Sequence, residues 1–247
     1  MNQKETFPEA IAVWYDTMMN YFDYSKTAAI IDNIIRNNFS GTKLPILEVG
    51  IGTGNLALEL MALEYDVEGI DHSPAMLKRA IQKGIIRQAL HLCDIKDFSL
   101  RKKFGAIISH AGPLRIDYTP TRGYFFETYL NPEEIDHALE NTANHLVPQG
   151  LLIMSIQNAP ERGISTKSSP TSQQFQNGYE AVKIIEEMGS KRRKRRILKQ
   201  NGKVITHIDH EFVTMPLTLF DERALHYQLI SKNHDPTNHF YIYRRKE

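Results

Sequence analysis

Leu47-Glu48-Val49-Gly50-Ile51-Gly52-Thr53-Gly54-Asn55 is the segment with the strongest structural signal in the chain. An apolar strand, residues 46–49, runs into three glycines at every second position, and a helix follows. Glycines in such a turn allow positive φ and a close approach of a ligand to the backbone. The start of the helix offers free N–H groups to an anionic group.

A second predicted strand, residues 67–70, ends at Asp71, roughly twenty residues after the first glycine. An acidic residue at this place is suited to hold the two hydroxyls of a ribose. The order of a strand, a glycine loop, a helix and a second strand that ends in Asp71 predicts a cofactor that contains a nucleoside. A dinucleotide loop would carry its third glycine where this chain has Asn55, which argues against a dehydrogenase.

Strands and helices alternate through the first two thirds of the chain, after a helical segment over residues 9–38. The expected strands are 44–49, 67–71, 89–93, 105–109 and 150–156, and the expected helices are 54–63, 74–82 and 132–145. Such alternation predicts parallel strands with crossover helices, in an α/β fold that binds ligands at the carboxyl ends of its strands.

The rest of the chain is less regular. Residues 158–178 are rich in Ser, Thr, Gln, Pro and Gly and predict a mobile loop, and a short helix is expected over about 179–187. Asn201-Gly202 between two strand-like runs predicts a β-hairpin. Asp221 is expected to cap a helix, and strands 229–233 and 240–244 close the fold.

The glycine loop resembles the first motif of the class I S-adenosylmethionine (AdoMet) methyltransferases. Further segments match this family in the same order, namely residues 67–77, 92–95, 104–110 and 146–153. The resemblance implies a Rossmann-like α/β fold: a seven-stranded, mostly parallel sheet, an antiparallel C-terminal hairpin, and an inserted antiparallel hairpin over the active site.

One domain over residues 1–247 is expected. Its parts are an N-terminal helical cap (1–43), a cofactor-binding core (44–157), a loop with the inserted hairpin (158–215), and a closing helix and strands (216–247).

The family resemblance also implies which residues contact AdoMet or its product S-adenosylhomocysteine. They are Tyr15, Tyr24, Glu48, Gly50, Ile51, Gly52, Asp71, His72, Met76, Cys93, Asp94, Ile95, Ser109 and His110. Asp71 would accept both ribose hydroxyls, Glu48 would orient the amino group, and Asp94 would contact the adenine amino group. The alternatives are that Asp71 is only a turn residue, that Glu48 is a buried acid held by backbone N–H groups, and that Asp94 forms an Asx turn.

Catalytic residues are harder to identify, because methyl transfer depends mainly on alignment of nucleophile, methyl and sulfur. His110, after the fourth strand, is a candidate proton acceptor, and Tyr15 is a candidate partner of the sulfonium through its ring. The alternatives are that His110 only packs in a turn and that Tyr15 and Tyr24 are aromatic core residues. Met76 is either a core residue or a neighbour of the adenine.

Two segments rich in charge leave alternatives open. Residues 113–129 are expected to form a loop at the acceptor entrance, where Arg115 or Arg122 either clamps an anionic group or lies solvated over packed aromatics. The run Lys191–Arg196 either binds RNA, an anionic substrate or a nuclear import receptor, or is a solvated helix-to-strand junction before the hairpin. His207 and His210 fall on opposite faces of a strand, and no metal site is predicted.

Composition limits the remaining possibilities. The chain has 247 residues, a net charge of +1 and one cysteine, Cys93. A near-zero charge does not favour nucleic acid as a partner. The lack of an apolar leader or membrane-length segment and the single cysteine favour the cytoplasm.

The sequence therefore predicts an AdoMet-dependent methyltransferase that acts on an N or O nucleophile of a small metabolite, with natural-product biosynthesis as one setting. The C-terminal layout, residues 216–220 onward, resembles that of sugar-amine N-methyltransferases. The alternatives are an RNA or protein methyltransferase and a non-catalytic AdoMet-binding protein. A homodimer is left open.

Overall fold

The computed structural model describes residues 9–20, 22–157, 170–232 and 240–247. Its α-helices are α1 (Glu9–Met18), α2 (Tyr24–Asn38), α3 (Asn55–Ala62), α4 (Pro74–Gln82), α5 (Pro132–His145) and α6 (Leu217–Arg223). The strands of the core are β1 (Ile46–Val49), β2 (Val67–Asp71), β3 (Leu90–Leu92), β4 (Phe104–Ser109), β7 (Leu146–Gln157), β12 (Tyr227–Lys232) and β13 (Phe240–Arg245). Six further strands are β5 (Arg115–Thr119), β6 (Gly123–Thr128), β8 (Thr171–Gln174), β9 (Tyr179–Met188), β10 (Lys191–Gln200) and β11 (Lys203–Pro216).

The core sheet has the strand order β3-β2-β1-β4-β7-β13-β12. The first five strands pair in parallel, and β13 and β12 are antiparallel at the end. The predicted Rossmann-like sheet with a C-terminal antiparallel hairpin is therefore confirmed. The glycine loop follows β1, and β1 lies inside the sheet between β2 and β4.

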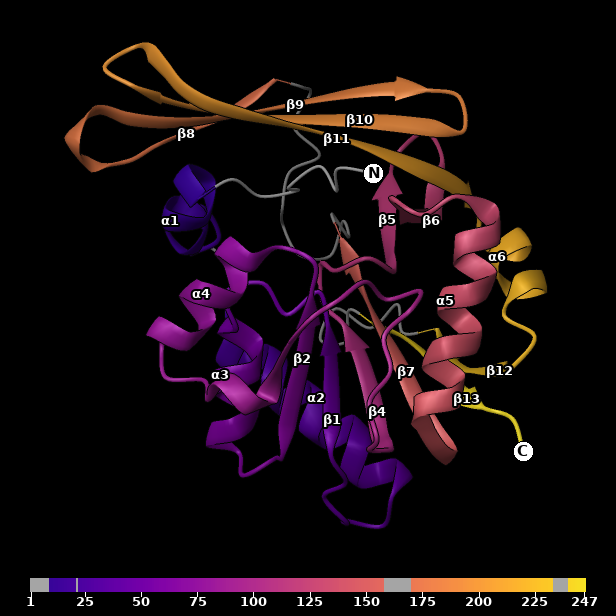
Figure 1. Cartoon of the computed structure of the whole chain (residues 1–247). Helices are drawn as coiled ribbons and strands as arrows, with labels where there is room; N and C mark the ends of the chain where they lie inside the picture. Colours follow the sequence, from indigo (N-terminus) through magenta and orange to yellow (C-terminus); the bar gives the residue numbers. More distant parts are fainter. Residues whose placement is uncertain (1–8, 21, 158–169, 233–239) are drawn as a thin grey trace.

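Helices cover both faces of this sheet (Figure 1). On one face, α2, α3 and α4 bury a cluster that includes Ile31, Leu60 and Ile108. On the other face, α5 and α6 bury a second cluster that includes Leu139 and Phe220. The α5 helix begins with a capping box, in which Asn131 and Glu134 bond reciprocally to each other's backbone N–H groups.

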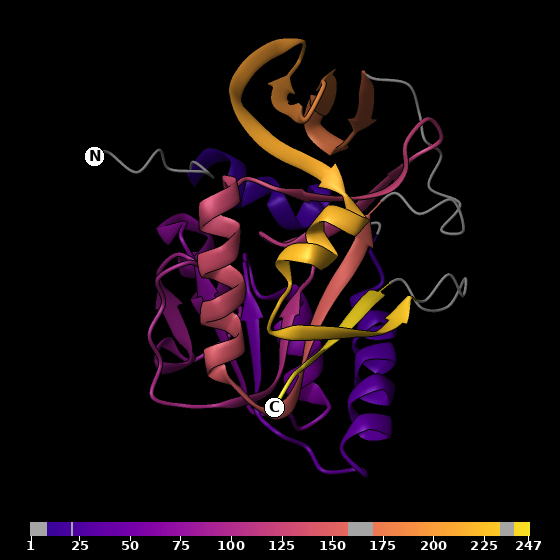
Figure 2. The same ribbon diagram turned by 90° about the vertical axis from the view of Figure 1, so that its right-hand side faces the viewer.

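The other six strands form an antiparallel layer across the carboxyl ends of the parallel strands (Figures 1 and 2). Its strand order is β5-β6-β11-β10-β9-β8, and β5 joins it to the end of β7 through the pair Ile116–Ile156. We call this layer the roof. The inserted element is thus larger than the predicted hairpin, although the predicted turn at Asn201-Gly202 does join β10 to β11.

Three local predictions are wrong. Residues 113–129 are not a loop, because most of them form the antiparallel pair β5–β6. Residues 179–187 are not a helix but strand β9, paired with β10 along its whole length. Asp221 does not begin a helix; it lies within α6 and accepts a hydrogen bond of 2.7 Å from the Tyr243 hydroxyl.

Part of the predicted loop 158–178 lies outside the described residues, namely 158–169, while residues 171–174 form strand β8. In the described part of the chain, no helix is long and apolar enough to cross a membrane. The division of residues 1–247 as one domain stays a prediction, as does the cytoplasmic location.

Candidate functional site

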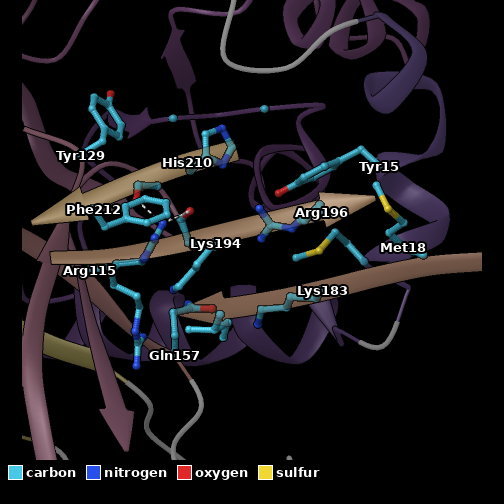
Figure 3. A pocket seen from close by; sticks show the side chains of 18 of the residues that line it. Tyr15, Met18, Arg115, Tyr129, Gln157, Lys183, Lys194, Arg196, His210 and Phe212 are labelled. Atoms are coloured by element: carbon cyan, nitrogen blue, oxygen red, sulfur yellow. Dashed lines mark hydrogen bonds between the residues drawn. The ribbon is translucent and has the colours of Figure 1, made fainter. Parts of the chain in front are cut away.

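A cavity of about 890 Å3 lies between the carboxyl ends of the parallel strands and the roof. Gly50, Gly52 and Asp71 line its floor, and Phe212 and other residues of β9–β11 line the roof side. Helix α1 contributes Tyr15 and Met18 at one end, as the close view shows (Figure 3). A cavity of this size can hold a cofactor together with a second small molecule.

The glycine loop has the backbone geometry that its sequence predicts. Gly50, Gly52 and Gly54 all have positive φ, of 73°, 56° and 79°. A Cβ at Gly50 would lie 2.8 Å from Cδ of Pro113, so the loop after β4 packs directly on this residue. A Cβ at Gly54 would collide with the side chain of Ile85, so this third glycine serves packing beneath the helix.

Asp71 ends β2 with its carboxylate on the cavity floor. The backbone N–H of Gly52 donates to Oδ2 at 2.9 Å, and the N–H of Ser73 donates to Oδ1 at 2.8 Å. Burial raises the pKa of this carboxyl, while His72 and the backbone N–H donors act in the opposite direction. These bonds fix the carboxylate to the glycine loop and orient it for further donors in the cavity.

A small recess opens beside the cavity. Its lining includes the predicted residues Tyr15, Tyr24, Glu48, Gly50, Ile51, Gly52 and His110. Glu48 is 3% exposed, and among the described residues its Oε2 atom has no hydrogen-bond partner. Burial, and secondarily the nearby charge of Asp71, raises the pKa of Glu48 well above its usual value. A buried carboxylate with one unsatisfied oxygen fits a ligand that brings a cationic donor.

Aromatic side chains surround this recess. The His110 ring lies 5.5 Å from Phe22 and 5.8 Å from Tyr24, in edge-to-face arrangements. Tyr15 borders both the recess and the main cavity. The electron-rich faces of such rings suit a positively charged ligand.

Helix α1 is fastened to both sides of the cavity, which the sequence did not predict. Asp16 accepts hydrogen bonds from the Thr53 hydroxyl at 2.5 Å and from the Asn55 amide at 3.1 Å, so α1 is tied to the end of the glycine loop. The Trp14 ring packs on Tyr179 of β9 with ring centroids 4.0 Å apart. These contacts hold Tyr15 in place between the loop and the roof.

His72 and Met76 line the main cavity, and the His72 ring lies 5.6 Å from that of Tyr129. Their contact with the cofactor stays a prediction. Tyr129 was not predicted to contact the cofactor. Burial, with help from Asp94 and Asp71, raises the pKa of its hydroxyl well above the usual value, so it stays protonated.

Among the residues that the structure describes, four of the predicted cofactor residues lie outside the linings of both the cavity and the recess. Ile95 packs in the hydrophobic core, and Ser109 is buried and accepts a bond of 3.1 Å from the Leu114 N–H. Asp94 accepts from the Lys96 N–H at 3.2 Å, which is the Asx-turn alternative. Cys93 is half-buried, and burial and nearby carboxylates raise its pKa to about 11. Contacts of these residues with the cofactor stay predictions.

A cluster of buried charges lies on the roof side of the cavity. The Arg192 guanidinium lies 2.6 Å from Asp117 and 3.1 Å from Glu127, and the Lys194 ammonium lies 2.5 Å from Glu127. Arg115 also contacts Glu127, at 2.7 Å. Burial opposes ionisation of Glu127, but Lys194, Arg115 and Arg192 together lower its pKa below the usual value.

The basic run Lys191–Arg196 is therefore neither a solvated junction nor a continuous charged surface. Alternation along β10 turns Arg192, Lys194 and Arg196 toward the cavity. The other three basic residues point outward and meet acids of neighbouring strands. The outer pairs are Lys191–Glu211 at 2.6 Å, Arg193–Glu186 at 3.6 Å and Arg195–Asp209 at 2.6 Å.

The arginines of the predicted entrance loop are partly buried. Arg115 lies 4.3 Å above the ring of Phe212 and lines the cavity. Arg122 lies 4.2 Å above Phe125 and donates to Thr214 at 3.0 Å. His210 lines the cavity, and His207 faces solvent. In the described ranges no three His, Cys, Asp or Glu side chains are grouped to hold a metal ion, and the absence of a metal site stays a prediction.

Comparison with known proteins agrees with this geometry. Residues 46–150 match a family model described as a methyltransferase domain. A dTDP-3-amino-3,4,6-trideoxy-alpha-D-glucopyranose N,N-dimethyltransferase of Streptomyces venezuelae is 31% identical over 133 residues, which cover 53% of this chain and 50% of the relative. A dTDP-3-amino-3,6-dideoxy-alpha-D-glucopyranose N,N-dimethyltransferase of Streptomyces fradiae is 28% identical over 171 residues, covering 68% and 56%.

The solved structure of SAM-bound CalS10, an amino pentose methyltransferase from Micromonospora echinaspora involved in calicheamicin biosynthesis, superposes with a TM-score of 0.68. The superposition covers 95% of this chain and 97% of that chain at 21% identity, and it shows a shared fold. The chain matches about half the length of the two curated relatives. The resemblance predicted from the glycine loop and its following motifs is confirmed.

Proposed function

Because residues 46–150 form a methyltransferase domain and the chain carries the class I AdoMet-dependent methyltransferase fold, we propose that the protein methylates the amino group of an amino sugar. The two curated relatives are both N,N-dimethyltransferases of amino sugars, which supports the choice of nitrogen as the acceptor atom. The setting we propose is natural-product biosynthesis, in which the CalS10 enzyme also acts.

The observation that carries the proposal is the arrangement of two carboxylates at one end of a two-part cavity. Asp71 is fixed by two backbone N–H groups, and Glu48 presents a buried oxygen without a partner among the described residues. Asp71 would accept hydrogen bonds from ribose hydroxyls, and Glu48 would accept from a cationic amino group. Both groups belong to AdoMet, so the residues fit the cofactor.

AdoMet supplies a methyl group activated by its positively charged sulfur. The chain's own contribution is alignment, which is worth about 7–11 kcal/mol when the reacting atoms are held in line. Tyr15 lies where its ring can face the sulfonium, held by Asp16 of the same helix and by Trp14 against the roof. His72 and Met76 border the cavity next to Asp71 and would line the adenosine end.

An amine attacks only as the neutral base, and its nitrogen must release a proton during methylation. We infer that His110 accepts this proton, because its imidazole borders the recess that holds Glu48 and an imidazole is the side chain that most often acts as a general base. The acceptor would enter from the roof side, past Phe212, Arg115 and Tyr129.

The alternative of an RNA or protein methyltransferase has less support. Half of the basic run points into the cavity, and the other half is paired with acids on the outer face. A surface that binds a polyanion would need cations that are not already neutralised by neighbouring carboxylates. We therefore favour a small acceptor inside the cavity.

The proposal is tested by incubating the purified protein with AdoMet and matched pairs of sugars that carry either an amino or a hydroxyl group at the same carbon. Mass spectrometry should show the gain of one or two methyl groups on the amino sugar only. Methylation of the hydroxyl sugar alone would refute the assignment to nitrogen. Tight AdoMet binding without turnover on any acceptor would favour the non-catalytic alternative.

A further inference from the structure

The last residue of β7, Gln157, presents its side-chain amide to the cavity. Its Nε2 donates a hydrogen bond of 2.9 Å to the hydroxyl oxygen of Ser155, two residues earlier on the same strand. Gln157 lines the cavity, and Figure 3 shows its side chain among those of the other lining residues. Among the residues that the structure describes, its carbonyl oxygen, Oε1, accepts no hydrogen bond. The amide thus has one fixed end and one end available to a ligand.

The same serine holds the loop that carries His110. The backbone N–H of Ala111 donates to Ser155 Oγ at 2.9 Å, and Ser155 is fully buried. Ala111 has a positive φ of 54°, which residues with a side chain seldom adopt, so this bond helps to hold an unfavourable backbone conformation. Two hydrogen bonds therefore link the amide of Gln157 to the residue that follows His110.

Ala111 also marks the boundary between the two parts of the site. It lines the recess that contains Glu48 and His110, and it lines the larger cavity that Gln157 borders. Under the proposed function the recess receives the amino group of AdoMet, and the acceptor occupies the larger cavity. The acceptor nitrogen would then meet the methyl group near Ala111, with Gln157 on the acceptor side.

We propose that Gln157 determines acceptor specificity: its Oε1 accepts a hydrogen bond from an N–H of the acceptor amine and turns the nitrogen lone pair toward the methyl group. This inference rests on the proposed function, because it names the contact that selects and orients the amine. A primary amine has two N–H groups, so one can be held by Gln157 while the other faces His110. A hydroxyl has a single hydrogen and cannot serve both residues.

An uncharged amide suits this task better than a carboxylate. A carboxylate at position 157 would stabilise the ammonium form of the acceptor, which has no lone pair for attack. The amide oxygen accepts from the neutral amine without adding a charge. During methylation the nitrogen forms its bond to the methyl carbon as the bond from that carbon to sulfur breaks, and the released proton goes to His110. Gln157 itself exchanges no proton and forms no covalent bond.

The test is steady-state kinetics of the full chain with AdoMet and the thymidine-diphosphate ester of 3-amino-3-deoxyglucose, an amino sugar of the proposed class. Gln157→Met removes the amide oxygen and keeps a side chain of similar length. It should lower kcat/KM for the amino sugar by at least about tenfold and leave AdoMet affinity unchanged. Gln173→Met is the matched control, because Gln173 lines the same cavity from β8, at the far edge of the roof, and its loss should leave kcat/KM unchanged.

Gln157→Glu separates a contact with the amine from a purely structural role. This variant keeps an oxygen that can accept from the amine, so its kcat at high pH should approach that of the wild type. Its carboxylate also stabilises the ammonium form of the bound acceptor, so the rise of kcat with pH should move upward by about one pH unit or more. The other charged side chains of the cavity are the same in both proteins, so the shift reports position 157. Unchanged kcat/KM in Gln157→Met, or coincident pH profiles for Gln157→Glu and the wild type, would overturn the proposal.

Calorimetric titration with the same amino sugar, on protein saturated with S-adenosylhomocysteine, distinguishes this failure from failure of the proposed function. Equal binding and equal methylation by the wild type and Gln157→Met would reject the role of Gln157 alone. Weaker binding by Gln157→Met than by the wild type, with methylation by neither, would reject the function and keep Gln157 as a contact of the acceptor amine. A wild type that neither binds nor methylates the amino sugar would reject both.

Discussion

Replacing Arg192 by methionine removes a guanidinium that is 2% exposed and lies between Asp117 and Glu127. Removing one member of a buried ion pair costs about 3–5 kcal/mol, because the partner charge stays buried. Here Lys194 still contacts both carboxylates, at 3.2 and 2.5 Å, and Arg115 still contacts Glu127. We therefore expect a loss near the lower limit, about 3 kcal/mol, which for a chain of this size lowers Tm by about 6–12 °C.

The assay is thermal and urea unfolding of the ligand-free protein at neutral pH. Arg195→Met is the matched control, because its guanidinium is paired with Asp209 on the outer face of the same strand and its loss should leave Tm within experimental error. Adding Asp117→Asn to Arg192→Met should restore part of the lost stability, since it removes the charge of a carboxylate that has lost one of its cations. Equal Tm values for the Arg192 and Arg195 variants would refute the structural role of the buried cluster.

Three further predictions concern the cofactor end and the charge cluster. Gly50→Ala should weaken AdoMet binding and lower Tm by a few degrees, because its Cβ would lie 2.8 Å from Pro113 and because positive φ costs about 1–2 kcal/mol for a residue with a side chain. A thermal-shift titration with AdoMet measures both effects, and normal affinity would contradict the close packing. Glu48→Gln should raise the Tm of the ligand-free protein at neutral pH while weakening AdoMet binding. Burial raises the folded-state pKa of Glu48, so its contribution to stability is lost as pH rises above the unfolded-state pKa of about 4.3. A lower Tm with unchanged AdoMet affinity would contradict the role assigned to Glu48. The lowered pKa of Glu127 contributes stability that is present above an unfolded-state pKa of about 4.3 and is lost as pH falls through the folded-state pKa. Between about pH 6 and about pH 3, the unfolding free energy should therefore fall less steeply in Lys194→Met than in the wild type. Parallel slopes would show that Lys194 does not set this pKa.

The cofactor end of the site could be predicted from the sequence because its determinants are local. Gly50, Gly52 and Asp71 lie at the ends of two adjacent strands, and each residue type has a backbone or hydrogen-bonding reason to be there. Their spacing along the chain therefore reflects their spacing in the fold. The same local logic identified the hairpin turn at Asn201-Gly202.

The roof could not be predicted in the same way, because its structure depends on distant partners. The segment Tyr179–Met188 contains apolar residues and helix-forming Glu and Lys, which favour a helix locally, but pairing with β10 makes it a strand. The inward half of the basic run is stabilised by Asp117 and Glu127, which lie 75 and 65 positions away from Arg192. No local pattern in the run shows which of its residues face these acids.

Isothermal titration of the wild type and of Asp71→Ala with AdoMet and with S-adenosylhomocysteine measures whether Asp71 at the cavity floor binds the cofactor. Asp71 is held by the Gly52 and Ser73 N–H groups at the floor of the cavity, and charged hydrogen bonds to ribose hydroxyls are worth about 1.5–3 kcal/mol each. We expect the wild type to bind both ligands with micromolar affinity, on the order of 1–10 μM, and the variant to bind them at least about a hundredfold more weakly. Failure of the wild type to bind either ligand, or equal affinity in the variant, would contradict cofactor binding at Asp71.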